Sequence, residues 1–284
     1  MNGIKERLMK LVFLISALAS VLAVGLICLF LFANGIPAIR EVGFFNFLGG
    51  TNWAPNDVPA SYGILPMILG SLYITAGAII IGVPIGIFTA VFMSKYCHKK
   101  MYAFLKPATE LLAGIPSIVY GFFGLVVLVP VVKNLFGGNG NSILTASILL
   151  GIMVLPTIIG VSESAIRSIP QSYYEGALAL GATKERSLFG VVIPAAKSGI
   201  MAGVVLGVGR AIGETMAVIM VAGNQPRLPN GILKGVRTLT ANIVIEMGYA
   251  QDLHREVLIA TGVVLFVFIL IINLSFSLIK RRDD

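Results

Sequence analysis

The chain has 284 residues, of which 57% are hydrophobic and only 12% are charged. A soluble domain typically carries about 25% charged residues, so these charges are too few to cover a water-exposed surface of this size. The composition argues against a soluble enzyme and a disordered protein, and it indicates an integral membrane protein. The net charge of +8 is therefore interpreted as a topology signal, with anionic lipid headgroups rather than nucleic acid as its natural partner.

Six apolar stretches are long enough for transmembrane helices, each of which needs about 20 residues. They are 11–33, 64–93, 111–132, 143–162, 198–222 and 257–279. The first is longer than the apolar core of a signal peptide, about 7–15 residues, so we expect an uncleaved span. The sequence thus predicts an all-α polytopic membrane protein. Residues 1–63 would form one transmembrane helix with an external segment, and residues 64–284 a domain of five further helices.

Lys and Arg residues alternate in density along the chain and predict the orientation. The N-terminus, the segments after the second and fourth spans, and the C-terminus hold most of them: Lys5, Arg7, Lys10, Lys95, Lys99, Lys100, Lys106, Arg167, Lys184, Arg186, Lys197, Lys280, Arg281 and Arg282. Such segments face the cytoplasm, so both termini are expected there. Cys28 would then lie in the membrane and Cys97 in a reducing cytosol, and we expect no disulfide between them.

Motifs for catalysis are missing from the sequence. There is no G-x-x-x-x-G-K-[ST] run for nucleotide binding and no H-E-x-x-H run for zinc. The only histidines, His98 and His254, fall on opposite sides of the predicted membrane, and each is expected to be a solvated loop residue. We therefore expect no catalytic residues, no metal site and no cofactor.

The predicted cytoplasmic loop 163–197 has the strongest local signals. Ser172 is a plausible N-cap for a short helix, and Gly181 suits the left-handed turn that would end it. Thr183 is the expected N-cap of a second short helix, and Pro194 interrupts the chain before the fifth span. The local pattern leaves two interpretations open: an elbow that fits a groove in a partner, or an amphipathic linker on the lipid headgroups.

The same loop resembles the E-A-A-x-x-x-G-x₉-I-x-L-P loop of bacterial ABC-importer permeases. The matching positions are Glu175, Gly176, Ala177, Gly181, Val191, Ile193 and Pro194, with Gly176, Val191 and Ile193 as small or aliphatic exchanges. The resemblance implies the type I ABC importer permease fold, with residues 64–284 as its transmembrane domain. It also implies that the loop is the coupling helix that docks on an ATPase subunit. The coupling residues would be Glu175, Gly176, Ala177, Gly181 and Pro194.

Other stretches resemble the phosphate-importer branch of these permeases. Residues 209–218 look like its G-R-A-x-G-E-T segment, and residues 111–122 are similar to its A-G-[IV]-P-S-[IV]-[VI]-Y-G stretch. Residues 52–55 and 62–66 resemble PstC-type rather than PstA-type subunits. The resemblance implies a bacterial inner-membrane subunit without its own ATPase site. Its partners would be a PstA-like second permease, a dimer of a PstB-like ATPase, and a PstS-like external phosphate-binding protein.

Two charged residues fall inside the predicted fifth span. Arg210 lies near its middle, where a charge costs about 2.5–3.5 kcal/mol and needs a partner or water. Glu214 is four residues further on, so it is expected on the same helix face as a possible partner. The pair could be structural. Alternatively, Arg210 could meet an anion in the substrate path, since guanidinium matches phosphate oxygens with paired hydrogen bonds, while Glu214 offsets it when the path is empty.

Two other functions stay open from the sequence. One is a permease of the same superfamily for another oxyanion, such as sulfate or molybdate. The other is an ion-coupled secondary transporter, a class that often has discontinuous helices, although the coupling-type loop argues against it.

In the external segment, Trp53 is expected to be an interfacial anchor or part of a docking surface. Asn224 and Gln225 are interpreted as polar loop residues.

Overall fold

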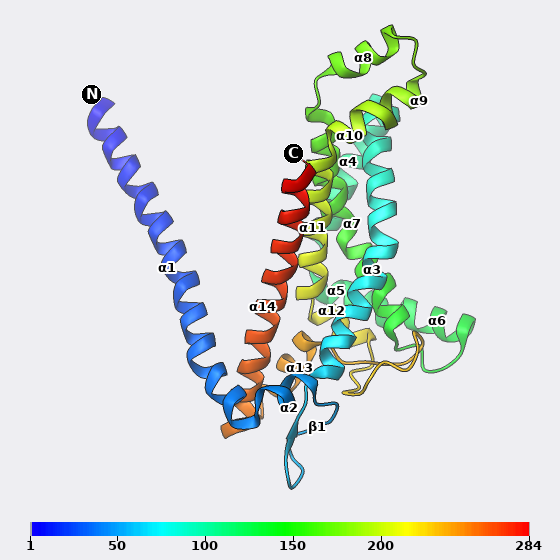
Figure 1. The fold of residues 1–284 in the computed structure, drawn as a ribbon. Coiled ribbons are helices and arrows are strands. Elements are labelled where there is room, and N and C mark those ends of the chain that lie inside the picture. The colour runs from blue at the N-terminus through cyan, green and yellow to red at the C-terminus, as the bar shows by residue number, and fades with distance from the viewer. Residues whose placement is uncertain (1, 284) are drawn as a thin grey trace.

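A computed structural model describes the backbone of residues 2–283 and the side chains of residues 5–275. The predicted cytoplasmic cluster of Lys280, Arg281 and Arg282 lies outside the residues with described side chains. The elements in chain order are α1 (Asn2–Val42), α2 (Phe44–Gly49), β1 (Trp53–Ala54), β2 (Ser61–Tyr62), α3 (Leu65–Val91), η1 (Phe92–Tyr96), α4 (Lys99–Gly114), α5 (Ser117–Phe123), η2 (Gly124–Leu128), α6 (Val129–Phe136), α7 (Ile143–Ser168), α8 (Gln171–Ala179), α9 (Lys184–Ser187), η3 (Leu188–Val192), α10 (Ile193–Ala195), α11 (Lys197–Gly213), α12 (Met216–Val221), α13 (Leu239–Glu246) and α14 (Asp252–Asp283) (Figure 1). The elements labelled η are π-helical turns.

The helices form an elongated bundle with the cytoplasmic signals gathered at one end. Figure 1 shows the start of α1, the end of α14 and the α8–α9 segment at that end. The short β1–β2 hairpin, in which Trp53 pairs with Tyr62, lies at the opposite end. This arrangement agrees with the charge pattern, which predicts both termini and the coupling loop on one side of the membrane.

The helix α7 is the centre of the bundle. Its side chains Leu149, Leu150 and Met153 are buried in a cluster that also draws on α3, α5 and α12. Ser142 caps its start by accepting the Thr145 N–H at 3.2 Å. Glycine permits close contact with α11, since a Cβ added at Gly207 would lie 2.9 Å from the Ile158 side chain. A long apolar helix enclosed on several sides gives the bundle a rigid axis.

Five described helices are long and apolar enough to cross a membrane, and a sixth is counted if the pair Lys184–Ala195 and Lys197–Gly213, bent by 67°, forms one span. The expected number of spans is therefore met. The fourth span is longer than the prediction, because α7 runs to Ser168 and not to residue 162. Glu163, which was expected to open the cytoplasmic loop, lies within this helix.

The third span, predicted as a continuous helix over 111–132, is broken. α4 ends at Gly114, and α5 begins at Ser117 after Pro116. Ile115 is extended, with φ −68° and ψ 126°, because a residue before proline is driven away from the helical region. Residues 111–114 thus end a separate helix, α4, and the apolar segment long enough to span runs from Ser117 to Phe136.

The segment before residue 63 stands partly apart from the bundle. Most side chains between Leu8 and Phe30 of α1 are exposed, and Figure 1 shows α1 diverging from α14 toward the N-terminus. Near its other end, Ala38 is buried in a cluster with Phe47, Trp53 and residues of α13 and α14. Phe32 also meets Phe266 edge to face at 5.9 Å. The external part of this segment therefore shares a core with the end of the chain.

Candidate functional site

The predicted coupling loop folds as an elbow of two short helices, α8 and α9, which project from one end of the bundle (Figure 1). The prediction of Ser172 as N-cap is wrong, because α8 begins at Gln171 directly after Pro170. Proline fixes its own backbone in a conformation suited to entering a helix, so no side-chain cap is used. The helical character of this part of the loop is confirmed.

The turn between the two helices has the predicted chemistry. Gly181 adopts φ +87°, a left-handed conformation that side chains with a Cβ rarely take. Thr183 then caps α9 by accepting the Arg186 N–H at 3.2 Å. Pro194 lies in α10, which meets α11 at the 67° bend. The sequence signals at Gly181 and Thr183 therefore set the shape of the elbow.

The tip of the elbow is exposed while its base is anchored. Leu180 is 92% exposed at the tip. Glu175 is exposed on α8, where it accepts a hydrogen bond from Gln171 at 2.8 Å. Leu188 and Val192 at the base are buried with residues of α3 and α7. The elbow therefore has an exposed tip and a base that is packed into the bundle.

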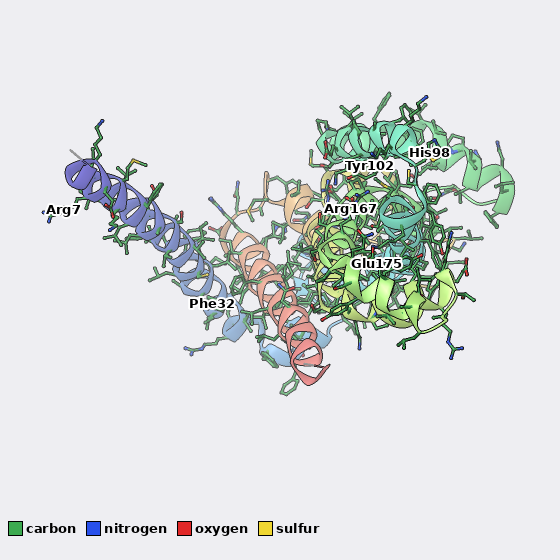
Figure 2. The ribbon with its side chains drawn as sticks, turned by 90° about the horizontal axis from the view of Figure 1, so that it is seen from above. Arg7, Phe32, His98, Tyr102, Arg167 and Glu175 are labelled. Atoms are coloured by element: carbon green, nitrogen blue, oxygen red, sulfur yellow. The ribbon has the colours of Figure 1, made fainter. Side chains whose placement is uncertain are left out.

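A buried carboxylate joins α7 to α4 beside the elbow. Glu163 is 1% exposed and forms ion pairs with Lys106, at 2.8 Å, and with Arg167. The Tyr102 hydroxyl donates to the same carboxylate at 3.0 Å, and the Arg167 guanidinium lies over the Tyr102 ring, 4.1 Å from its centroid. Figure 2 shows Tyr102 and Arg167 side by side. This cluster was not predicted from the sequence, because Glu163 was expected to be the first residue of a loop.

The environment of Glu163 keeps Lys106 and Tyr102 in the protonated forms that can donate hydrogen bonds to it. The hydrogen bond to Glu163 raises the pKa of Lys106 above its ordinary value, so the ammonium stays charged. Burial, with the hydrogen bond to Glu163, raises the pKa of Tyr102, so its hydroxyl remains a donor. The cluster therefore fastens α4 to the central helix α7 at neutral pH.

Removing the charge of Glu163 is expected to loosen this end of the bundle. Glu163→Gln leaves two cations without a partner, and we expect the free energy of unfolding to fall by about 1–3 kcal/mol, a loss moderated because both cations are partly exposed. Thermal unfolding of the purified chain measures the effect. Glu110→Gln, which alters an exposed carboxylate on α4, is the matched control and should leave the transition unchanged.

The fifth predicted span, 198–222, is not one helix. α11 ends at Gly213, Glu214 is extended with ψ 129°, and α12 starts at Met216. The Glu214 carboxylate accepts the backbone N–H groups of Thr215 at 3.1 Å and Ala217 at 3.2 Å. These bonds satisfy backbone donors at the start of α12, which explains why the chain can break there.

The expected pair on one helix face is therefore corrected. Glu214 caps α12, and among the side chains that the structure describes no carboxylate lies within ion-pair distance of Arg210. Arg210 is half-buried on the side of α11 that also carries the exposed Leu206 and Gly213. Gly207, three residues before Arg210 and therefore its neighbour on the helix surface, contacts α7. Arg210 thus lies at the border between the side of α11 that contacts α7 and the exposed side that carries Leu206 and Gly213.

A second buried carboxylate organises the opposite end of the bundle. Glu246 is 5% exposed and accepts the Trp53 indole N–H at 3.0 Å. Arg237 Nη1 donates to its Oε1 at 2.5 Å, and His254 Nε2 lies 2.9 Å from its Oε2. Burial, with the charge of Glu246, raises the pKa of Tyr249, whose ring also contacts His254.

This cluster overturns two expectations. Trp53 is buried and bonded, so it is neither an interfacial anchor nor part of an open docking surface. His254 is 8% exposed and is not a solvated loop residue, whereas His98 is exposed as predicted. Sequence distance hid the contact, because Trp53 and Glu246 are 193 positions apart. The cluster ties the β1–β2 hairpin to α13 and α14.

Breaking the Glu246 cluster is expected to destabilise the fold. Glu246→Gln leaves the buried Arg237 guanidinium, 12% exposed, without its anion, and the free energy of unfolding should fall by about 3–5 kcal/mol. The lost protection should appear first as faster hydrogen exchange in the β1–β2 hairpin. Glu256→Gln, at an exposed position of α14, is the control, and equal destabilisation by both changes would contradict this role.

Comparison with known proteins identifies the family. Residues 82–282 match the model of the binding-protein-dependent transport system inner membrane component family. The chain belongs to this permease family. The permease is 40% identical over 266 residues to the probable ABC transporter permease protein YqgH of Bacillus subtilis, covering 90% of this chain and 86% of the relative. It is 36% identical over 290 residues to the phosphate transport system permease protein PstC of Mesorhizobium japonicum, covering 94% and 88%.

Solved structures place the permease in the type I ABC importer permease fold. A chain of a bacterial alginate ABC transporter, solved in complex with an alginate-bound periplasmic protein, has a TM-score of 0.65 at 19% identity, covering 95% of this chain and 94% of that one. A chain of the MetNI methionine ABC transporter in an inward-facing conformation has a TM-score of 0.63 at 20% identity, covering 78% and 96%. Identities this low support the shared fold alone.

Proposed function

We propose that this permease is a membrane-spanning subunit of an ATP-driven phosphate importer of the bacterial cytoplasmic membrane. The observation that carries the proposal is that the phosphate-type G-R-A-x-G-E-T segment contains Arg210, a half-buried cation of α11 beside the exposed Leu206 and Gly213 and without a carboxylate partner among the described residues. Relatives named as phosphate permeases, at 36% identity over most of the chain, support the same substrate. The positive charge of Arg210 favours an anionic substrate. The relatives named as phosphate permeases favour phosphate among the possible anions.

The subunit would form part of the substrate path and would not itself catalyse a reaction. The open side of α11 would face a PstA-like second permease, and the two chains would enclose the path between them. Because Glu214 is engaged with α12, Arg210 is available to an anion that enters this space. Guanidinium stays charged at any working pH and can bind two phosphate oxygens at once.

The elbow would couple this path to ATP hydrolysis in a PstB-like ATPase dimer. The tip around Glu175, Gly176, Ala177 and Gly181 would dock in the ATPase, and the buried base would pass its movement to α3 and α7. Alternation between outward-open and inward-open forms then proceeds by rigid-body motion. A PstS-like external protein would deliver phosphate and carry most of the affinity.

Uptake by the reconstituted complex tests the substrate. The permease is placed in vesicles with its second permease, the ATPase and phosphate-loaded external binding protein, and uptake of radiolabelled phosphate is measured with competing anions. We expect arsenate to compete, because it has the shape and charge of phosphate, and sulfate and molybdate to have no effect. Competition by sulfate or molybdate with weak phosphate uptake would assign the permease to another oxyanion.

A further inference from the structure

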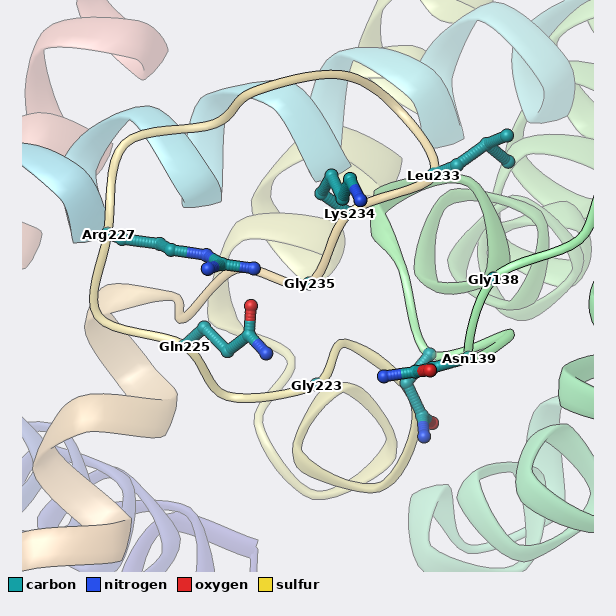
Figure 3. Close-up of a pocket in the computed structure, with 9 residues that line it drawn as sticks. Gly138, Asn139, Gly223, Gln225, Arg227, Leu233, Lys234 and Gly235 are labelled. Atoms are coloured by element: carbon teal, nitrogen blue, oxygen red, sulfur yellow. The ribbon is translucent and has the colours of Figure 1, made fainter.

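A polar pocket of about 190 Å³ opens at the end of the bundle opposite the elbow. It lies between the turn that precedes α7 and the loop from Gly223 to Gly235. Figure 3 shows the side chains of Gln225 and Arg227 pointing into the ring that this loop forms, with Asn139 facing them from the turn. By the predicted topology, the pocket faces the outside of the cell.

The pocket is positively charged. Arg227 and Lys234 line it and are exposed, and within the described part of the chain none of its lining residues is acidic. Two lining amides, Asn141 and Gln225, also have buried side-chain oxygens that receive no hydrogen bond from the described residues. The pocket therefore combines two cationic side chains, which favour an anionic ligand, with two amide oxygens that can accept hydrogen bonds from N–H groups.

The backbone around the pocket is firmly held. The Leu144 N–H donates to the Ile232 carbonyl at 2.9 Å, and the Ile143 N–H donates to the Lys234 carbonyl at 3.1 Å. Gly223 forms a parallel bridge with Val236 on the other side of the loop. The loop thus rests on the first turn of α7, and that helix runs from the pocket to the Glu163 cluster near the elbow.

We propose that this pocket is a socket for an acidic side chain of the external phosphate-binding protein, which inserts when that protein docks. The inference rests on the proposed function and extends it to a docking site. A polypeptide fits better than a free phosphate ion, because its carboxylate meets Arg227 and Lys234 while its N–H groups can satisfy the two amide oxygens. A chain of the same fold, from the alginate transporter, was solved with its periplasmic protein.

A pair of charge reversals tests the socket. The ATPase activity of the complex in nanodiscs is measured at increasing concentrations of phosphate-loaded binding protein, and the concentration that gives half-maximal stimulation is compared between the wild type and Arg227→Glu/Lys234→Glu. We expect that concentration to rise about tenfold or more, with less salt dependence, while basal ATPase activity stays the same. Arg40→Glu/Arg255→Glu reverses two exposed cations outside the pocket, makes the same change in net charge and should leave the half-maximal concentration unchanged.

The outcomes separate the socket from the alternatives and from the proposed function. An unchanged half-maximal concentration in the pocket variant, or an equal rise in the control variant, would overturn the socket. Binding of inorganic phosphate to the wild-type complex, lost in the pocket variant while binding-protein stimulation is kept, would assign the site to the free anion and also overturn it. A wild-type complex that is stimulated without importing phosphate would contradict the proposed function and leave the docking result to stand by itself.

Discussion

Arg210→Gln is expected to lower phosphate uptake by about tenfold to a hundredfold while leaving the transporter assembled. Hydrogen bonds to a charged group contribute about 1.5–3 kcal/mol each, and glutamine retains a donor but loses the charge. The large effect is expected if Arg210 binds phosphate as proposed, since no carboxylate among the described residues pairs with it. Uptake of radiolabelled phosphate in vesicles measures transport, and recovery of all partner subunits with the purified permease measures assembly.

Two companion variants make this result specific. Arg210→Lys keeps the charge but loses the paired geometry, and its uptake should fall between those of the wild type and Arg210→Gln. Glu214→Gln keeps an acceptor oxygen for the α12 N–H groups and should have a smaller effect. Normal transport by Arg210→Gln would show that the arginine has a packing role, and loss of assembly would show that it holds the structure together.

Reversing the charge of Glu175 is expected to release the ATPase from the membrane complex. Glu175 is exposed on α8 with only Gln171 as its hydrogen-bond partner, so Glu175→Lys should leave the fold of the permease intact. We expect at least about tenfold less ATPase to be recovered with the affinity-purified permease, the size of effect that follows when a docked charge is reversed.

The control for the elbow is Glu6→Lys, which reverses an exposed carboxylate near the start of α1. Figure 2 shows the neighbouring Arg7 far from Glu175. The control should recover the ATPase as the wild type does. Equal recovery for Glu175→Lys would place the docking surface elsewhere and would favour the linker interpretation of the loop.

Local signals in the sequence were sufficient for the membrane class, the number of spans and the elbow. Gly181 and Thr183 act through their own backbone and the next turn, so residue type and spacing predict their conformation. The breaks in the third and fifth spans were harder to predict. Pro116 gave a usable signal that average hydropathy concealed, whereas the break at Glu214 depends on a carboxylate turning back to bond to the next helix.

Each of the two buried carboxylates has partners that are distant in sequence, and these contacts could not be predicted. Trp53 is 193 positions from Glu246, whereas Arg237 and His254 are nine and eight positions away but reach it through a turn that no local pattern predicts. For Glu163, the i,i+4 spacing to Arg167 was a local signal that α7 continues past residue 162. The contribution of Lys106 depends on the packing of α4 against α7 and is visible only in the folded chain.

ATP dependence of phosphate uptake tests the central claim most directly. Vesicles containing this permease with its second permease, the ATPase and the external binding protein are compared with vesicles containing this chain alone. We expect uptake only in the complete complex and only when ATP is supplied on the side of the elbow. Phosphate uptake by this chain alone, driven by an ion gradient and indifferent to ATP, would contradict the account and identify a secondary transporter.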